Sequence, residues 1–187
     1  HGNVYDKHMN NGGIYFTAFQ PLDEERTGVS RFDDILVENC YLEDVNRWGI
    51  AAAYTAYHTF FAGKEIPDEV AARYGSSRVV IRGNYVKDAG GDAITPMYCD
   101  RPLVERNISQ GAGRQMNLKD YSESQLGRVA AAVWPWKCKN ALLQYNEVFE
   151  TRYHNGENQD GQAFDADWGD GTVYQYNYSH DNEGGCL

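Results

Sequence analysis

The stretch of sequence that decides the fold occurs twice, with similar residues at matching positions. It reads Ile35-Leu-Val-Glu-Asn-Cys-Tyr-Leu-Glu-Asp-Val-Asn-Arg-Trp-Gly-Ile50, and it aligns without gaps with Val79-Val-Ile-Arg-Gly-Asn-Tyr-Val-Lys-Asp-Ala-Gly-Gly-Asp-Ala-Ile94 at an offset of 44 residues. The first part of this template returns at 103–107, 142–146 and 173–177. Self-similarity of this kind is typical of repeat proteins, in which each repeat buries its apolar face by stacking on its neighbours.

Each copy is a short run of β-forming residues that ends at one special position. The residues at that position are Cys40, Asn84, Asn107, Asn146 and Asn177. Asparagine tolerates left-handed backbone and hydrogen-bonds to neighbouring backbone, as a turn stacked on an identical turn requires. We predict an interior asparagine ladder at these positions, with a structural role and not a catalytic one.

A second regularity joins the copies into coils. An apolar residue stands 13 residues before the asparagine in three of them, and these residues are Ile94, Val133 and Phe164. Equal intervals indicate that each coil runs from one core-facing strand through a turn to the next strand. The coils then differ in length only by insertions, which fall at 54–77, 114–128 and 152–160.

The predicted fold class is all-β, a right-handed parallel β-helix (solenoid) with loop insertions and one short helix. That helix is expected within Pro67–Gly75, because proline favours a helix start and glycine a helix end. A propeller or sandwich would need hairpin signals, and neither Asn-Gly dipeptide of the chain stands between paired strand-like runs. Both ends of the chain resemble cuts through a coil, so we expect residues 1–187 to be a partial β-helix domain, a fragment of a longer chain whose remaining coils are its partner.

Charge and composition exclude several classes of function. The chain has 187 residues, with 17 Lys and Arg against 27 Asp and Glu, and a net charge of −10. This balance repels phosphate backbones and anionic lipid, so nucleic acid and membranes are not expected partners. The four cysteines form no C-x-x-C motif, which argues against structural zinc. No cofactor and no catalytic metal are expected, although a structural calcium ion stays open.

Strand alternation predicts which residues point away from the interior. When Ile50, Ile94, Val133 and Phe164 face the core, the residues one and three positions later face outward. The first outward column contains Ala51, Thr95, Trp134 and Asp165, and the second contains Ala53, Met97, Trp136 and Asp167. Neighbouring coils lie about 4.8 Å apart, so two indoles of one coil lie beside two carboxylates of the next.

The carboxylate pair Asp165 and Asp167 is the predicted catalytic pair. Two carboxylates on one face of a strand raise each other's pKa, which supplies a protonated acid beside an ionised base or nucleophile. Their spacing does not decide between a retaining and an inverting mechanism. A calcium site or a solvated acidic face explains the same Asp-x-Asp pattern, and both alternatives stay open.

The predicted substrate-binding residues surround this pair. Trp134 and Trp136 offer flat apolar surfaces for sugar rings, or instead pack under an inserted loop. Thr95 belongs to the same outward column as Trp134, and Arg114 is a candidate for binding a uronate carboxylate or an ordinary surface charge. His154 lies in the insertion 152–160, which overhangs the Asp165 coil, so His154, Glu157 and Asp160 are candidates for closing over a substrate or are ordinary polar residues of an exposed loop.

Two further residues near the candidate site are given structural roles. Asp92 lies two residues before Ile94, so we interpret it as a turn cap. Trp168 follows the carboxylate pair and faces inward by alternation, which predicts a core or corner residue.

The phrases Gly83-Asn-Tyr-Val-Lys-Asp-Ala-Gly-Gly-Asp-Ala-Ile94 and Tyr176-Asn-Tyr-Ser-His-Asp-Asn-Glu-Gly-Gly185 resemble the β-helix repeat of carbohydrate-active enzymes. The resemblance extends over nearly the whole chain and is specific to the fold more than to one activity. It implies a secreted, periplasmic or cell-surface enzyme that acts on a complex polysaccharide or oligosaccharide, similar to glycoside hydrolases of family 141. The polygalacturonases are a poorer match, because their Asn-Thr-Asp, Asp-Asp and Gly-His-Gly motifs are absent.

Glycoside hydrolysis is therefore the predicted function, and two alternatives remain. A polysaccharide lyase on the same fold needs Lys or Arg as a base, and the outward columns contain neither. A non-catalytic glycan-binding or adhesin solenoid would use the tryptophan pair without the carboxylates.

Overall fold

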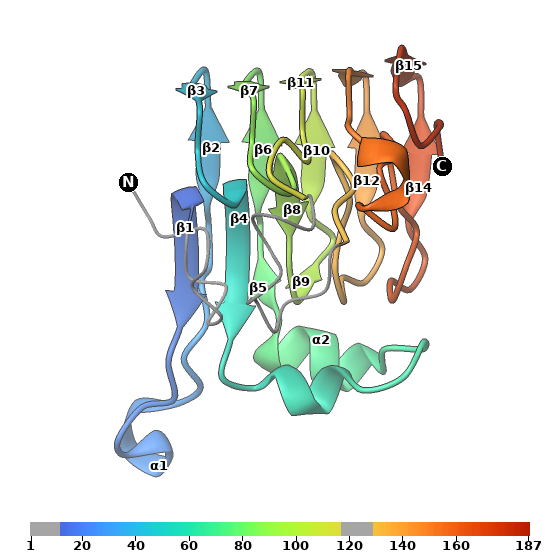
Figure 1. Ribbon diagram of the computed structural model, residues 1–187. Coiled ribbons are helices and arrows are strands. Elements are labelled where there is room, and N and C mark those ends of the chain that lie inside the picture. The colour runs from blue at the N-terminus through green and yellow to red at the C-terminus, as the bar shows by residue number, and fades with distance from the viewer. Residues whose placement is uncertain (1–11, 117–128) are drawn as a thin grey trace.

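The chain is built mainly of short strands in parallel sheets, with few helices. The computed structural model describes residues 12–116 and 129–187 (Figure 1). Most of the predicted insertion at 114–128, from residue 117 on, and residues 1–11 lie outside the described residues. The helices are α1 (Glu24–Thr27), η1 (His58–Phe61), α2 (Asp68–Tyr74) and η2 (His154–Gly156). Within the described part of the chain, none of these helices is long and apolar enough to cross a membrane.

Two five-stranded parallel sheets contain the repeated template. The first sheet has the order β14-β12-β10-β6-β2, and the second has the order β15-β13-β11-β7-β3. The strands of the first sheet are β2 (Leu36–Glu38), β6 (Val80–Arg82), β10 (Leu103–Glu105), β12 (Leu142–Gln144) and β14 (Val173–Gln175). Those of the second are β3 (Tyr41–Glu43), β7 (Tyr85–Lys87), β11 (Ile108–Gln110), β13 (Glu147–Phe149) and β15 (Tyr178–His180). The pairs Leu36↔Val80 and Tyr41↔Tyr85 confirm the predicted alignment at an offset of 44 residues.

A third parallel sheet has the order β1-β4-β8, and a two-stranded sheet pairs β5 with β9. Their strands are β1 (Gly12–Ala18), β4 (Trp48–Thr55), β8 (Ile94–Pro96), β5 (Ser76–Ser77) and β9 (Cys99–Asp100). Single bridges continue the third sheet from Ile94 to Val133 and from Val133 to Phe164. The chain visits the first, second and third sheets in the same order each time, and Figure 1 shows the successive passages side by side. We call each passage a coil.

The interior between the sheets is filled by one apolar column per strand. The four residues predicted to face the core, Ile50, Ile94, Val133 and Phe164, are buried in one cluster. Each contributes on the order of 2 kcal/mol by leaving water. Because the column continues from coil to coil, every coil buries its apolar face against the next one.

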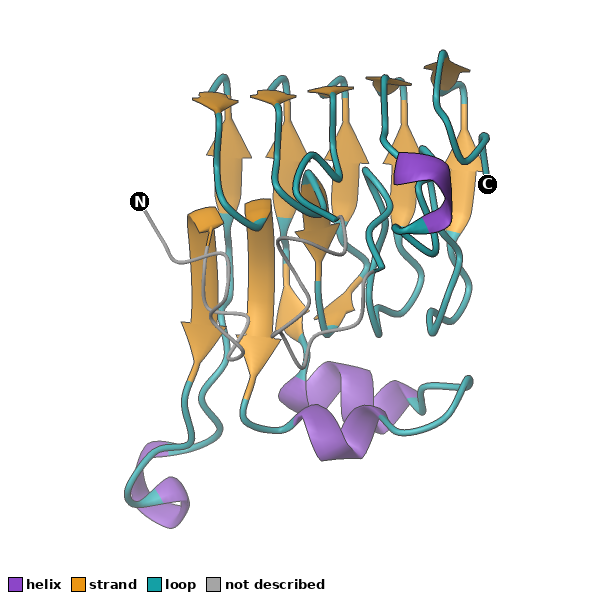
Figure 2. Cartoon of the chain, in the orientation of Figure 1, coloured by secondary structure: helices purple, strands orange, loops and turns teal. Residues whose placement is uncertain are grey.

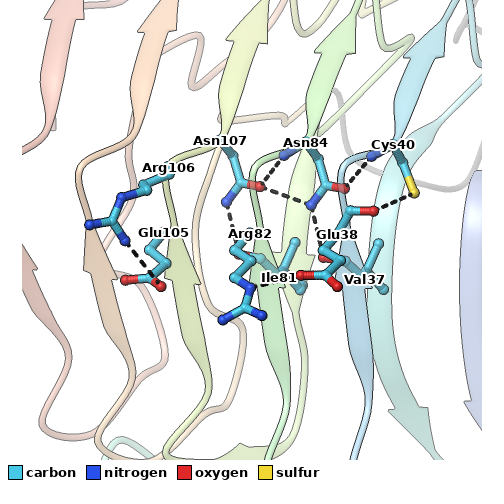
Figure 3. A network of polar contacts seen from close by, with 9 residues as sticks. All are labelled: Val37, Glu38, Cys40, Ile81, Arg82, Asn84, Glu105, Arg106 and Asn107. Carbon is cyan, nitrogen blue, oxygen red and sulfur yellow. Dashed lines mark hydrogen bonds and ion pairs between the residues drawn. The ribbon is translucent and has the colours of Figure 1, made fainter.

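The predicted asparagine ladder is confirmed, and part of it is shown in Figure 3. Asn107 Oδ1 accepts from the backbone N–H of Asn84 at 3.0 Å and from its side-chain amide at 2.9 Å. Asn107 Nδ2 donates to the carbonyl of Ile81 at 2.9 Å, and Asn146 repeats the pattern one coil later. At the other end, Cys40 donates its backbone N–H to Asn84 Oδ1 at 3.0 Å. Buried amides with all these partners fix the register of neighbouring coils.

The predicted short helix is also confirmed. It is α2, which begins after Pro67 and ends before Gly75. With η1 it forms the helical part at one end of the strands (Figure 2). Phe61, Ile66 and Ala71 of this insertion form a second buried cluster with Met97 and other residues outside the main core. The insertion therefore covers part of the outer surface of the third sheet.

Candidate active site

One cavity of about 640 Å³ opens where the tryptophans of the chain gather. Its lining includes all four tryptophans and four aspartates, together with Arg47. These tryptophans and aspartates are Trp48, Trp134, Trp136, Trp168, Asp92, Asp160, Asp165 and Asp167. Cavities of this size, with apolar rings and a few convergent polar groups, are typical of small-molecule sites.

Two neighbouring coils bring the two predicted pairs together. Val133 and Phe164 form a parallel bridge and are both buried, so the residues that follow them point outward in register. The residues of this kind that line the cavity are Trp134 and Trp136 from one coil and Asp165 and Asp167 from the next. The structure thus places the indole pair and the carboxylate pair in one cavity, as the sequence predicts.

The indoles of Trp134 and Trp136 form a bent aromatic wall. Their ring centroids lie 6.2 Å apart and their planes are inclined by 35°. Trp136 also lies 5.8 Å from the ring of Tyr98, at the edge of the cluster that covers the third sheet. Both indoles are partly exposed and line the cavity.

Of the core or corner position predicted for Trp168, the core position is wrong, because the residue stands exposed at a turn of the chain. It has a φ of 55°, so the chain leaves the strand geometry on which alternation depends. The side chain is 44% exposed and lines the cavity. The ammonium group of Lys137 lies 4.4 Å from the centroid of its ring, a cation–π contact that holds the indole at the cavity rim.

Asp160 reaches the cavity from the predicted insertion at 152–160. The fully buried side chain of Asn158 holds this loop, because its amide donates to the carbonyls of Ala130 and Arg152 at 3.0 and 2.8 Å. Asn158 Oδ1 accepts from the backbone N–H groups of Ala130 at 3.0 Å and Asp160 at 3.3 Å. Burial raises the pKa of the Asp160 carboxyl, and the negative charges of Asp92 and Asp167 raise it further.

The carboxyl of Asp165 is half-buried in the same cavity. Burial raises its pKa, and the charges of Asp160 and Asp167 add to the rise, while the backbone N–H groups of Ala166 and Asp167 oppose it. Asp167 is exposed, and its charge acts on the ammonium of Lys137, whose pKa is lowered by burial. Three carboxyl groups that influence one another electrostatically therefore share this cavity.

Asp92 is a buried member of the cavity lining and not the turn cap that its position suggests. The side chain is 1% exposed, and its Oδ2 lies 3.4 Å from Arg47 Nη2. Its Oδ1 accepts from the indole Nε1 of Trp134 at 2.7 Å and from the backbone N–H of Ala131 at 3.3 Å. Burial raises the pKa of the Asp92 carboxyl, and the Arg47 guanidinium and the Trp134 indole oppose this rise.

Three predicted substrate-binding residues lie outside the cavity. Thr95 points away from the core but is 0% exposed, so its hydroxyl does not reach a ligand. The guanidinium of Arg114 pairs with Asp44 at 2.5 Å and with the carbonyl of Asp88 at 3.2 Å. His154 Nε2 lies 2.7 Å from the carbonyl oxygen of Gly113, so this side chain fastens the insertion to a neighbouring coil.

No metal-binding cluster is evident in the described part of the chain. Among residues 12–116 and 129–187, no three His, Cys, Asp or Glu side chains are grouped to hold a metal ion. The four cysteines are free thiols.

Comparison with known proteins finds similarity to glycoside hydrolases. No family model matches the sequence. The chain is 49% identical over 200 residues to a lacto-N-biosidase of Bifidobacterium longum subsp. longum, an alignment that includes 100% of this chain and 12% of that protein. Two crystal structures of the GH136 lacto-N-biosidase from Eubacterium ramulus, of the native protein and of its selenomethionine derivative, each match with a TM-score of 0.94 at 53% identity.

The chain corresponds to only a part of these relatives. The structural match includes 99% of this chain but only 30% of each Eubacterium ramulus chain. The Eubacterium ramulus enzyme belongs to GH136, so the expected similarity to family 141 is not confirmed, whereas the broader expectation of a glycoside hydrolase is supported.

Proposed function

We propose that this chain supplies the active site of a glycoside hydrolase that acts on oligosaccharides carrying a lacto-N-bioside group. The observation that carries this proposal is the single cavity in which all four tryptophans meet four aspartates. The substrate class comes from the lacto-N-biosidases to which the chain is 49% and 53% identical.

The aromatic wall suits a sugar ligand. The C–H faces of a pyranose ring stack on the faces of indoles, and carboxylates accept hydrogen bonds from its hydroxyl groups. Trp134 and Trp136 form the predicted subsite and Trp168 extends it along the cavity, while the buried Trp48 packs in the same cluster as Trp136. The volume of about 640 Å³ is in the range of sites for ligands larger than one sugar ring.

The carboxyl groups suit acid–base chemistry on a glycosidic bond. A glycosidase uses one protonated carboxyl as general acid and one carboxylate as nucleophile or base. We assign the acid to Asp160, because burial and the charges of Asp92 and Asp167 raise its pKa, whereas backbone N–H groups oppose the corresponding rise at Asp165. Asp167 is the exposed carboxylate near Lys137 and is assigned as nucleophile or base. Asp165 remains the alternative acid, as the sequence pattern proposes.

Three variants of the full-length protein test these assignments: Asp160→Asn, Asp165→Asn and Asp167→Asn. We expect Asp160→Asn to lose at least about 100-fold in kcat on an oligosaccharide, since general acids contribute that much, and to lose far less on an aryl glycoside. Asp167→Asn should lose activity on both substrates. Asp181→Asn, an exposed change outside the cavity, is the matched control and should leave kcat unchanged.

Other outcomes of this series contradict the assignment. If only Asp165→Asn lost kcat on the oligosaccharide while keeping most activity on the aryl glycoside, Asp165 would be the general acid and Asp165 and Asp167 the catalytic pair. A wild-type protein that binds lacto-N-biose without turnover would be a glycan-binding module, and an unsaturated product absorbing in the ultraviolet would reveal a lyase. The lyase is less favoured, because Arg47 of the cavity lining already pairs with Asp92 and Arg114 lies elsewhere.

The proposed fold is a section of a right-handed parallel β-helix. It is supported by the three parallel sheets that the chain visits in a constant order and by the stacked asparagines. The further coils of such a β-helix are the proposed partner, and the proposed location is secreted, periplasmic or cell-surface.

A further inference from the structure

A buried ion pair lies behind the aromatic wall of the cavity. Arg47 is 4% exposed and Asp92 is 1% exposed, and their side chains approach to 3.4 Å. Removing two charges from water is costly, and a pair of this kind adds little net stability compared with apolar residues. Its presence beside the candidate site therefore calls for a role other than stability.

The contacts of this pair connect it to two of the four tryptophans. Asp92 Oδ1 accepts from Trp134 Nε1 at 2.7 Å, the length of a strong charge-assisted hydrogen bond. The Arg47 guanidinium lies 5.0 Å from the centroid of the Trp48 ring. One buried pair thus holds the edge of one indole and lies over the face of another.

Arg47 itself is fixed on several sides. Its Nη1 lies 3.1 Å from the sulfur of Met116, and its Nη2 donates to the carbonyl of Val129 at 3.3 Å. A Cβ atom at Gly91 would approach the Arg47 side chain to 2.9 Å, so this glycine leaves the space that the guanidinium fills. The Arg47 side chain is therefore held in one position. Because Asp92 is paired with Arg47, its carboxylate is also held in place where it accepts the hydrogen bond from Trp134.

We propose that Asp92 is a positioning residue that fixes the indole of Trp134, so that one ring face is presented to a sugar in the cavity. This inference rests on the proposed function. An indole without this bond can turn about its χ2 torsion, which is broad for aromatic side chains. The hydrogen bond to Asp92 selects one of these orientations, and pre-ordering the ring lowers the cost of binding.

The test compares Asp92→Ala, Asp92→Asn, Trp134→Phe and the double variant Asp92→Ala/Trp134→Phe in the full-length protein. Binding of lacto-N-biose is measured by calorimetry, and KM and kcat are measured at the pH optimum of each variant. We expect Asp92→Ala and Trp134→Phe each to weaken binding about tenfold, and the double variant to be no weaker than either single variant. Additive losses would overturn the proposal, because Asp92 would then contact the sugar directly.

The indole N–H gives a second readout that does not need turnover. In protein labelled with 15N-tryptophan, the resonance lost in Trp134→Phe identifies Trp134, and we expect slow hydrogen exchange in the wild type. Asp92→Ala should accelerate this exchange at least about tenfold, while Asp92→Asn, which keeps an acceptor oxygen, should preserve it together with most of the affinity. Unchanged exchange in Asp92→Ala would refute the positioning role.

This design separates the two proposals. If the wild type neither binds nor hydrolyses a lacto-N-bioside, the proposed function fails, while the exchange data still decide whether Asp92 fixes Trp134. If Asp92→Ala does not fold, Asp92→Asn decides the matter: tenfold weaker binding with the Trp134 N–H still protected would mean that the carboxylate charge acts on the sugar, and would overturn the proposal.

Discussion

The ammonium group of Lys137 lies 4.4 Å from the centroid of the Trp168 ring and also donates to the carbonyl of Gly63 at 3.1 Å. A lysine of the coil that carries Trp134 and Trp136 thus joins the rim tryptophan to the insertion at 54–77. Trp168 stands on a left-handed turn and is 44% exposed, so the contact with Lys137 is an important restraint on its ring. The position of this indole depends on the lysine.

Lys137→Met is therefore expected to loosen Trp168 and to raise KM about threefold to tenfold, with a smaller change in kcat. This increase in KM corresponds to the loss of a partly desolvated cation–π contact, which is worth about 1 kcal/mol. Steady-state kinetics measure the effect, and Lys87→Met, which removes a lysine paired with Glu43 on the outer surface, is the control. Equal kinetics for Lys137→Met and the wild type would show that Trp168 does not contact the substrate.

Asn158→Ala is expected to lower kcat by about 100-fold. The change removes the amide whose four hydrogen bonds hold the loop of Asp160, the proposed general acid, and displacing a catalytic group by about 1 Å has effects of this size. The neighbouring change Gln159→Ala, at an exposed side chain of the same loop, should leave kcat within about twofold. Similar losses in both variants would contradict a specific role of Asn158.

Asn107→Ala should lower the free energy of unfolding by about 3 kcal/mol or more. It leaves the backbone N–H of Asn84 and the carbonyl of Ile81 without their partners inside the protein. Ser109→Ala is the matched control, because the buried Ser109 hydroxyl has no hydrogen-bond partner and its removal should change stability by less than about 1 kcal/mol. Denaturant unfolding measures both, and equal losses would argue against the ladder as a stabilising device.

Asp165→Asn should make the protein more stable at neutral pH. The folded-state pKa of Asp165 is raised, so the ionised carboxylate is less favourable in the folded than in the unfolded chain. The penalty is absent below the unfolded pKa of about 4 and grows as pH rises through the folded pKa. The difference in Tm between Asp165→Asn and the wild type should therefore shrink as pH falls from 7 to 4. A difference that does not depend on pH would contradict this origin.

The features that depend on the stacking of coils are predictable from the sequence. The repeated residues predict the offset between Ile50 and Ile94 and the positions of the stacked asparagines. Pro67 and Gly75 predict where the short helix begins and ends. The presence of Trp134 and Asp165 in one cavity follows from strand alternation, because the preceding residues Val133 and Phe164 form a parallel bridge.

The features that depend on insertions and turns are not predictable in this way. Thr95 is outward but buried, because pointing away from the core does not expose a side chain when other parts of the chain cover the sheet. Trp168 leaves the alternation through its left-handed backbone. Asp92 and Asp160 enter the cavity from outside the repeated columns. All four tryptophans line one cavity, but their positions in the sequence do not reveal this, because only the fold brings them together.

The asparagine ladder keeps one geometry while the chain between its members varies greatly. The bonds from backbone N–H to the next side-chain oxygen measure 2.9 to 3.0 Å although the residues they join are 44, 23, 39 and 31 positions apart. Insertions such as the Asp160 loop can therefore lengthen, shorten or be exchanged without disturbing the stack. A scaffold of this kind lets evolution, or a designer, change the ligand that the cavity accepts by replacing loops while the asparagines keep every coil in place.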